Sequence, residues 1–294
     1  MLRVYSARPY VILTMRRAII LAENKTLIDP ETGELIYATV LDYGDRVTTE
    51  SQRAGAADHF ERETFKGRNT GFTFTSMDAI HFVIERLTTA QCGYLLVLQC
   101  YVDYDGGRII GADNKALTTA EMMDVLQLRR KRQTFYDFLG ACLDSGIITK
   151  DEHDSYYVNP RYHFRGTTQS RMVVRTYTAK IKRAYREVKA VDLGLMYRML
   201  PFVHVKENAL CANPNERDPK KIRWFNVKSL ASAIGVDEKT LSRRLPQLKF
   251  AGEYVIMRHS LGNERKFSFN PHVFYRGNKA PSDGVTALFN GSAA

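Results

Sequence analysis

The chain ends two of its stretches with the same pattern, Asn-Pro-x4-Arg-Gly. The pattern occupies residues 159–166 and returns 111 positions later at residues 270–277. Each copy follows a helix-sized apolar pattern and two short β-like runs. A duplicated helix pair with a duplicated strand pair restricts the chain to folds in which both copies pack in the same way. We therefore predict two tandem helix-turn-helix units, each followed by a strand-turn-strand wing, a plan typical of nucleic-acid-binding proteins.

The second copy carries the clearer helix-turn-helix motif. Ala231, Gly235 and Leu241 have the spacing A-x3-G-x5-L. The small Ala lets two helices cross closely, Gly permits the tight turn, and Leu anchors the second helix. Asp237 is placed to cap that helix, whereas Pro246 lies inside it and should kink or shorten it. The side chains predicted to face outward and contact DNA are Lys239, Thr240, Ser242, Arg243 and Arg244.

The first copy departs from this motif. Thr118 and Glu121 form a capping-box pattern at the start of its first helix. Met123 and Gln127 occupy the places of Ala and Gly, and two extra residues precede the core aromatic Phe135. We expect a longer turn here, with some cations reaching phosphates from the turn and one or two facing base edges. The predicted DNA contacts are Arg129, Arg130, Lys131, Arg132 and Gln133.

The two predicted wings differ in charge. The second wing carries Arg258, Arg265 and Lys266, which we predict to contact DNA. The tip of the first wing carries three acidic residues between positions 151 and 154, which would repel a phosphate backbone. That copy is expected to bind DNA by its helix alone, or to turn its wing toward a protein. For Arg165 and Arg276, at the ends of the two copies, we favour a structural role over phosphate contact.

The remaining segments complete the predicted organisation. Residues 1–70 are predicted to be a β-rich region with a hairpin at 27–36 and a polar mobile arm at 42–68, which includes a short helix near 58–65. Helices are expected at 79–87 and 90–101, and Gly194 matches Gly93 in its position before the motif. The predicted fold class is mainly α with small β wings (α+β): a β-rich N-terminal region, winged-helix units at 71–166 and 167–277, and a flexible tail at 278–294.

Composition favours a polyanionic partner. The formal net charge is +11, although a solvated basic face would give the same count. The four cysteines form no CxxC pair, so buried free thiols in a reducing cytosol are expected, with no metal and no cofactor. No apolar run reaches the roughly 20 residues of a membrane span. We expect a cytoplasmic protein of a bacterial cell or nucleoid, or of a phage-infected cell, without a membrane partner.

No catalytic constellation is recognised in the sequence. There is no GxxxxGK[ST] loop for a triphosphate and no His-x-His pair that would hold a metal beside a nicking tyrosine. The seven His are scattered along the chain. We therefore predict that the protein is not an enzyme.

The N-terminal hairpin at residues 27–34, the helical segment, the winged helix and the ending at residues 157–166 together resemble the RepL-type plasmid replication proteins of Firmicutes and their phage-encoded relatives. The resemblance covers residues 24–166. The second unit resembles a further winged helix of phage or plasmid replication and regulatory proteins. Membership would imply a DNA-binding initiator without nicking or ATPase activity.

Together these features predict a sequence-specific double-stranded DNA-binding protein that acts as a plasmid- or phage-type replication initiator. A transcriptional repressor or activator is the alternative, and a protein-interaction scaffold built from winged helices is the third. Expected partners are double-stranded DNA and host replication or transcription proteins, while a homodimer formed through residues 90–101 is left open. We expect the second unit to recognise sequence and the first to hold mainly the DNA backbone.

Overall fold

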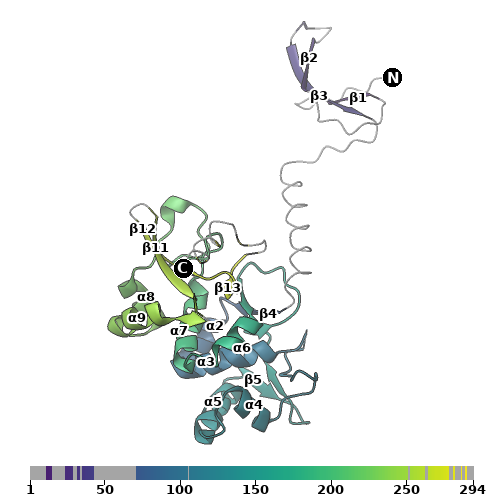
Figure 1. Ribbon diagram of the computed structural model, residues 1–294. Coiled ribbons are helices and arrows are strands. Elements are labelled where there is room, and N and C mark those ends of the chain that lie inside the picture. The colour runs from purple at the N-terminus through teal and green to yellow at the C-terminus, as the bar shows by residue number, and fades with distance from the viewer. Residues whose placement is uncertain are drawn as a thin grey trace. The chain divides into compact units, whose positions relative to one another are not determined.

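The computed structural model divides into two compact units, Met1–Phe60 and Glu61–Ala294 (Figure 1). It describes residues 11–14, 24–28, 32–33, 35–42, 71–104, 106–250, 252–261 and 264–277, and positions 281, 286 and 289. The arm predicted at 42–68, its short helix and most of the predicted tail therefore lie outside the described residues.

The smaller compact unit, Met1–Phe60, contains a three-stranded sheet. Its order is β1 (Val11–Thr14), β3 (Leu35–Asp42) and β2 (Asn24–Ile28), with β1 parallel and β2 antiparallel to β3. Ile28 of β2 pairs with Leu35 of β3, and Gly33 between them has φ +75°. The hairpin expected at residues 27–36 corresponds to this pair of strands.

The larger compact unit, Glu61–Ala294, is a mixed α+β structure, which confirms the α+β class. A similar order of elements occurs twice along it, and the two passes are called its first and second halves. The first pass contains β4 (Phe72–Ser76), α2 (Ile80–Arg86), α3 (Thr89–Leu98), η1 (Gln99–Tyr101), α4 (Thr119–Val125), α5 (Arg132–Asp144), β5 (Ile148–Lys150), β6 (Tyr156–Val158) and β7 (His163–Phe164). The second pass contains β8 (Val173–Tyr177), α6 (Thr178–Ala184), α7 (Ala190–Met199), η2 (Leu200–Phe202), η3 (Pro219–Lys221), α8 (Val227–Ile234), α9 (Glu238–Arg244), η4 (Leu245–Gln247), β9 (Lys249–Phe250), β10 (Glu253–Tyr254), β11 (Ile256–Leu261), β12 (Glu264–Phe269) and β13 (Phe274–Tyr275).

A four-stranded sheet of order β13-β8-β4-β7 joins the two halves. At its centre β4 and β8 run antiparallel, and Phe74, the third residue of β4, pairs with Arg175, the third residue of β8. Each central strand is flanked by the last strand of its own half, with Phe164 opposite Phe74 and Tyr275 opposite Arg175. Phe164 and Tyr275 hold the same place in the repeated Asn-Pro pattern. The pairing is therefore symmetric about an approximate two-fold axis.

The central helices α3 and α7 meet in the same symmetric way. Gly93 and Gly194 are each the fifth residue of their helix. A Cβ atom on Gly93 would lie 1.9 Å from the carbonyl oxygen of Ala190, and one on Gly194 would lie 1.6 Å from that of Thr89. The helices therefore pack backbone against backbone, which only glycine permits. Buried residues of both halves form one continuous core around this contact, so the boundary expected near residue 166 lies within a shared core.

The repeated Asn-Pro pattern has the structural role expected for it. Asn159 donates through Nδ2 to the carbonyl oxygen of Gly146, and Asn270 donates through Nδ2 to that of Tyr254. The buried guanidinium of Arg276 donates to the carbonyl oxygens of Val203 and Pro214 at 2.7 and 2.9 Å. These bonds tie the end of each hairpin back to the core.

Candidate nucleic-acid interface

In the second half, α8 and α9 are joined by a tight turn. Gly235 ends α8 in the left-handed conformation, with φ 68° and ψ 41°. Ala231 and Leu241 are buried where the two helices meet, and the carboxylate of Asp237 accepts a hydrogen bond from the backbone N–H of Thr240 at 2.8 Å. The predicted small residue, turn glycine, N-cap and anchor are thus all found in these positions.

The outer face of α9 is polar. Lys239, Ser242 and Arg243 are exposed, and Thr240 is half-buried. The helix ends at Arg244 because Pro246 follows within η4, which agrees with the expectation that this proline would shorten the helix. The surface that α9 offers to a partner is therefore two turns long.

Arg244 does not share this outer face. It forms an ion pair with Asp192 of α7, and both side chains are largely withdrawn from solvent. The prediction that Arg244 contacts DNA is not supported, because its side chain joins α9 to the central helix. The sequence gives no local sign of this partner, which lies 52 positions away.

In the first half, the turn after α4 begins as the turn after α8 does. The N–H of Leu128 donates to the carbonyl of Met123 at 2.8 Å, as that of Val236 does to Ala231 at 3.0 Å. Gln127 takes the place of Gly235 and also has a positive φ, 54°. The chain then continues further before α5 begins at Arg132, as the two extra residues predicted.

The basic cluster is divided between this turn and α5. Arg129, Arg130 and Lys131 precede α5, and Arg129 forms an ion pair with Asp124 that holds the pKa of that carboxyl below its usual range. Arg130, Lys131, Arg132 and Gln133 are exposed. Three cations of the cluster are thus available at the start of α5.

Tyr136, which was not among the predicted contacts, also lies on this surface, and its side chain is 44% exposed. It lies one turn after Gln133, whose Nε2 donates to Asp137 at 2.7 Å. In the sequence, Gln133, Tyr136 and Asp137 have the spacing of one helix face, and Phe135 and Phe138 have that of another. This spacing could have predicted that Tyr136 is exposed.

The first wing has an acidic tip that its own backbone organises. Asp151 accepts hydrogen bonds from the N–H groups of His153 and Ser155, and from the hydroxyl of Tyr157 at 2.9 Å. The N–H of Ser155 is the main cause that lowers the pKa of Asp151. The carboxylate is therefore charged at neutral pH, and this tip does not suit a phosphate backbone.

In the second wing only part of the predicted basic set faces outward. Arg258 is exposed on β11, and the side chain of Arg265 lies outside the described ones. Lys266 is 3% exposed, with its Nζ 3.0 Å from Glu207 Oε2 and 4.1 Å from the ring centroid of Trp224. The prediction that Lys266 contacts DNA is wrong, because its side chain is buried against Glu207 and Trp224.

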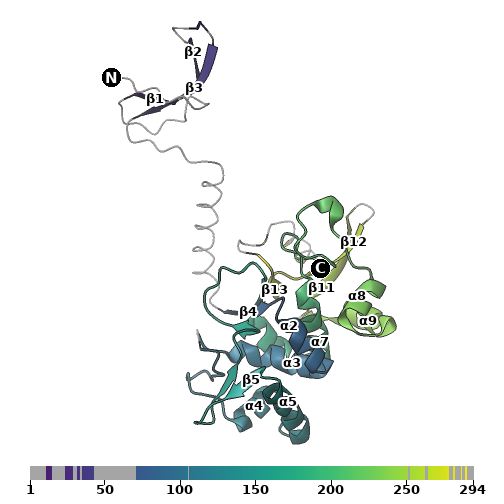
Figure 2. The same ribbon diagram turned by 180° about the vertical axis from the view of Figure 1, so that it is seen from behind.

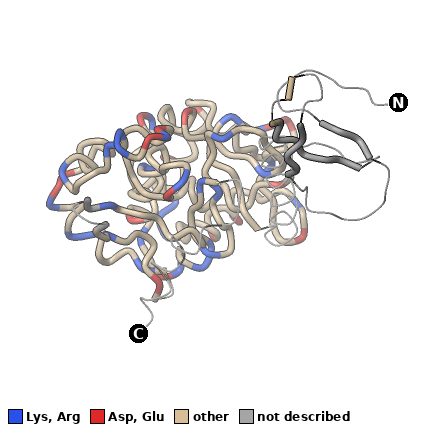
Figure 3. The backbone as a smooth tube through the Cα atoms, turned by 90° about the horizontal axis from the view of Figure 1, so that it is seen from above, with Lys and Arg blue, Asp and Glu red and all other residues tan. Residues whose placement is uncertain are grey.

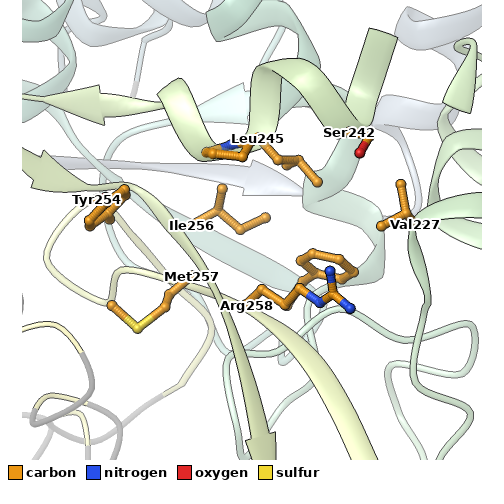
Figure 4. A pocket seen from close by; sticks show the side chains of 9 residues that line it. Val227, Ser242, Leu245, Tyr254, Ile256, Met257 and Arg258 are labelled. Atoms are coloured by element: carbon orange, nitrogen blue, oxygen red, sulfur yellow. The ribbon is translucent and has the colours of Figure 1, made fainter. Parts of the chain in front are cut away.

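A pocket of 310 Å³ lies between α9 and the second wing (Figure 4). Val227, Leu245, Ile256 and Phe267 supply apolar walls. Ser242 of α9 and Arg258 of β11, both predicted DNA contacts, line the same pocket. The fold therefore brings residues of the helix and the wing to one surface.

Basic residues are not confined to one patch. Figure 3 shows Lys and Arg spread along the second unit with Asp and Glu between them. Among the described residues, no cluster of His, Cys, Asp or Glu could hold a metal ion, and the four cysteines are buried free thiols. No described helix is both long and apolar enough to cross a membrane.

Comparison of the chain with protein-family models, with curated proteins and with solved structures found no match.

Proposed function

We propose that the chain is a sequence-specific double-stranded DNA-binding protein with two winged-helix units, acting as a plasmid- or phage-type replication initiator without nicking or ATPase activity. The observation that carries this proposal is the pair α8–α9. Its tight turn at Gly235 leaves Lys239, Ser242 and Arg243 on an exposed face of a short second helix. Long cations and a small hydroxyl are the groups that contact phosphates and base edges in the major groove.

Three further observations support DNA as the partner. The pair α4–α5 holds the equivalent place in the first half and exposes Arg130, Lys131 and Arg132. Arg258 of the second wing lines one pocket with Ser242 of α9, so helix and wing can contact one duplex together. The net charge of +11 favours a polyanion. The acidic first wing fits a contact with a host replication or transcription protein better than a DNA contact.

A salt series on a mixed-sequence duplex tests the proposal. We expect affinity to fall steeply with salt, and the double variant Lys239→Ala/Arg243→Ala to reduce the log–log slope by about 0.9 for each phosphate that it no longer neutralises. Lys115→Ala/Lys220→Ala is the matched control, because it removes two exposed cations outside the helix pairs. A shallow slope, or equal effects of both double variants, would contradict DNA binding through α9.

A transcriptional repressor or activator would use the same contacts, so the bound site separates the two functions. Iterated sites inside a replication origin support the initiator. A single operator that overlaps a promoter supports the regulator. Duplex affinity that is insensitive to salt would instead favour a protein-interaction scaffold.

A further inference from the structure

The two helix pairs are related by the symmetry of the core. Phe74 pairs with Arg175 at the centre of the sheet, and Gly93 meets Gly194 where α3 and α7 cross. In each contact the two partners hold the same position in their own half, so one two-fold axis relates both. In Figures 1 and 2, α9 lies beside α7 on the side away from β4, and α5 lies below α3. The axis therefore relates α5 of the first half to α9 of the second.

The first six residues of α5 correspond to the first six of α9. Phe135 and Leu241 are each the fourth residue of their helix, and both are fully buried. Around this anchor, one position outside the core carries Thr in both helices, at Thr134 and Thr240. Three exposed pairs differ in chemistry: Gln133 with Lys239, Tyr136 with Ser242, and Asp137 with Arg243.

We propose that one chain binds two half-sites that are inverted relative to each other on the duplex and unlike in sequence. This inference rests on the proposed DNA binding. B-DNA has two-fold axes perpendicular to its own axis, so helices related by a two-fold axis meet half-sites of opposite orientation. Helices related by translation would instead meet direct repeats. The half-sites differ because the exposed faces of α5 and α9 differ.

A second copy of the chain is not needed for this arrangement. In a symmetric dimer the contact that relates two recognition helices lies between subunits. Here the equivalent contact, between α3 and α7 and between β4 and β8, lies within one chain and is part of its core. The expected stoichiometry is therefore one chain for each bound site.

A transplant of the exposed face tests the orientation. The variant Gln133→Lys/Tyr136→Ser/Asp137→Arg gives α5 the side chains of α9, and all three replaced residues are exposed, so the core is unchanged. Wild type and variant are each used to select sites from a random-sequence duplex library. The wild type should select two unlike elements, and the variant should select the α9 element twice as an inverted repeat. The matched control Gln133→Ala/Tyr136→Ala/Asp137→Ala should select the α9 element once.

Directed DNA cleavage provides a second measurement that does not depend on new base contacts. All four native cysteines are buried, so a single Cys at Gln133→Cys or Lys239→Cys can carry an iron chelate that cleaves DNA. On the selected wild-type site the two cleavage patterns should be mirror images about the centre of the site. Native mass spectrometry should find one chain bound.

The outcomes separate this inference from the function beneath it. A direct repeat, a single copy selected by the transplant variant, cleavage patterns in the same orientation, or two chains on one site would overturn the inverted arrangement and leave DNA binding intact. Absence of duplex binding by the wild type would instead overturn the proposed function.

Discussion

Gly93 of α3 and Gly194 of α7 face each other across the helix crossing, and each leaves room for a backbone carbonyl of the other helix. The nearest oxygens belong to Ala190 and Thr89, which are the first residues of α7 and α3. The N-terminal ends of both helices therefore lie at the contact between the two halves. The close approach fixes how the halves are oriented, and with it the relation between α5 and α9.

Gly194→Ala should destabilise the larger compact unit, Glu61–Ala294. The added methyl group would overlap backbone atoms of α3, which cannot move as a flexible side chain could, and overpacking of this kind costs about 3 kcal/mol. Urea unfolding followed by circular dichroism measures the loss. Gly140→Ala is the control, because Gly140 lies inside α5 with open space around it, and Ala should add up to about 1 kcal/mol there. Equal effects of the two substitutions would contradict the close packing of α3 and α7.

The positive φ of Gln127, in the turn between α4 and α5, should lower the free energy of unfolding. Its φ of 54° is unfavourable for any residue with a Cβ, and its Nε2 compensates in part by donating to the carbonyl of Tyr185 at 3.2 Å. Gln127→Ala removes the hydrogen bond and keeps the cost, whereas Gln127→Gly removes both. We expect the Gly variant to be more stable than the Ala variant by about 1 kcal/mol in urea unfolding. The same comparison at Gly235, where wild type is already Gly, should show Gly235→Ala less stable by a similar amount.

A buried chain of hydrogen bonds that joins the two halves should make stability depend on pH. His163 is fully buried, with its Nδ1 3.2 Å from the hydroxyl of Thr75 and its Nε2 2.7 Å from the hydroxyl of Tyr197. Burial lowers the pKa of His163 to about 3. Between that pH and about 6.5 the unfolded chain binds a proton that the folded chain does not. The contribution of His163 is therefore complete above pH 6.5 and is lost as pH falls toward 3.

The size of this effect can be measured against a variant that cannot titrate. A shift of one unit corresponds to about 1.4 kcal/mol, so His163 should remove up to about 2 kcal/mol of unfolding free energy between pH 6.5 and 5. His163→Gln should flatten the pH profile by that amount, whatever its stability at pH 7. Burial also lowers the pKa of His204 and His259, so part of the slope should remain in the variant. Parallel profiles for the two proteins would show that His163 is not held neutral in the fold.

Sequence patterns identified local structure well where the signal was contained in a few neighbouring residues. Gly235 ends α8 in the expected conformation, and Thr118 and Glu121 form the expected capping box. Pro246 shortens α9 as a residue without a backbone donor must. The repeated Asn-Pro pattern marks the ends of both halves, because Asn159 and Asn270 make equivalent hydrogen bonds.

Contacts between residues far apart in the sequence could not be predicted from local patterns. The pairing of β4 with β8 joins residues about a hundred positions apart, and no local pattern specifies which strand a short run will pair with. For the same reason Lys266 could not be separated from Arg258 by sequence, since its partners Glu207 and Trp224 lie in a distant loop. Whether a basic residue of a predicted wing can contact DNA depends on what packs against each face of the hairpin.

Substitution of the adjacent residues Arg243 and Arg244 should change different properties, DNA binding for Arg243 and stability for Arg244. Arg243 is exposed, so Arg243→Ala should weaken duplex binding and lower its salt slope while leaving urea unfolding unchanged. Arg244 pairs with Asp192, so Arg244→Ala should lower the free energy of unfolding by about 1 kcal/mol and leave the salt slope of binding at the wild-type value.

A double-mutant cycle with Asp192→Ala isolates the role of Arg244. If the ion pair accounts for its effect, Arg244→Ala should cost little stability once Asp192 has been removed, since the partner carboxylate is no longer left without its cation. A salt slope reduced by Arg244→Ala as much as by Arg243→Ala would instead place Arg244 on the DNA, and the α7 contact would then be an alternative to that position.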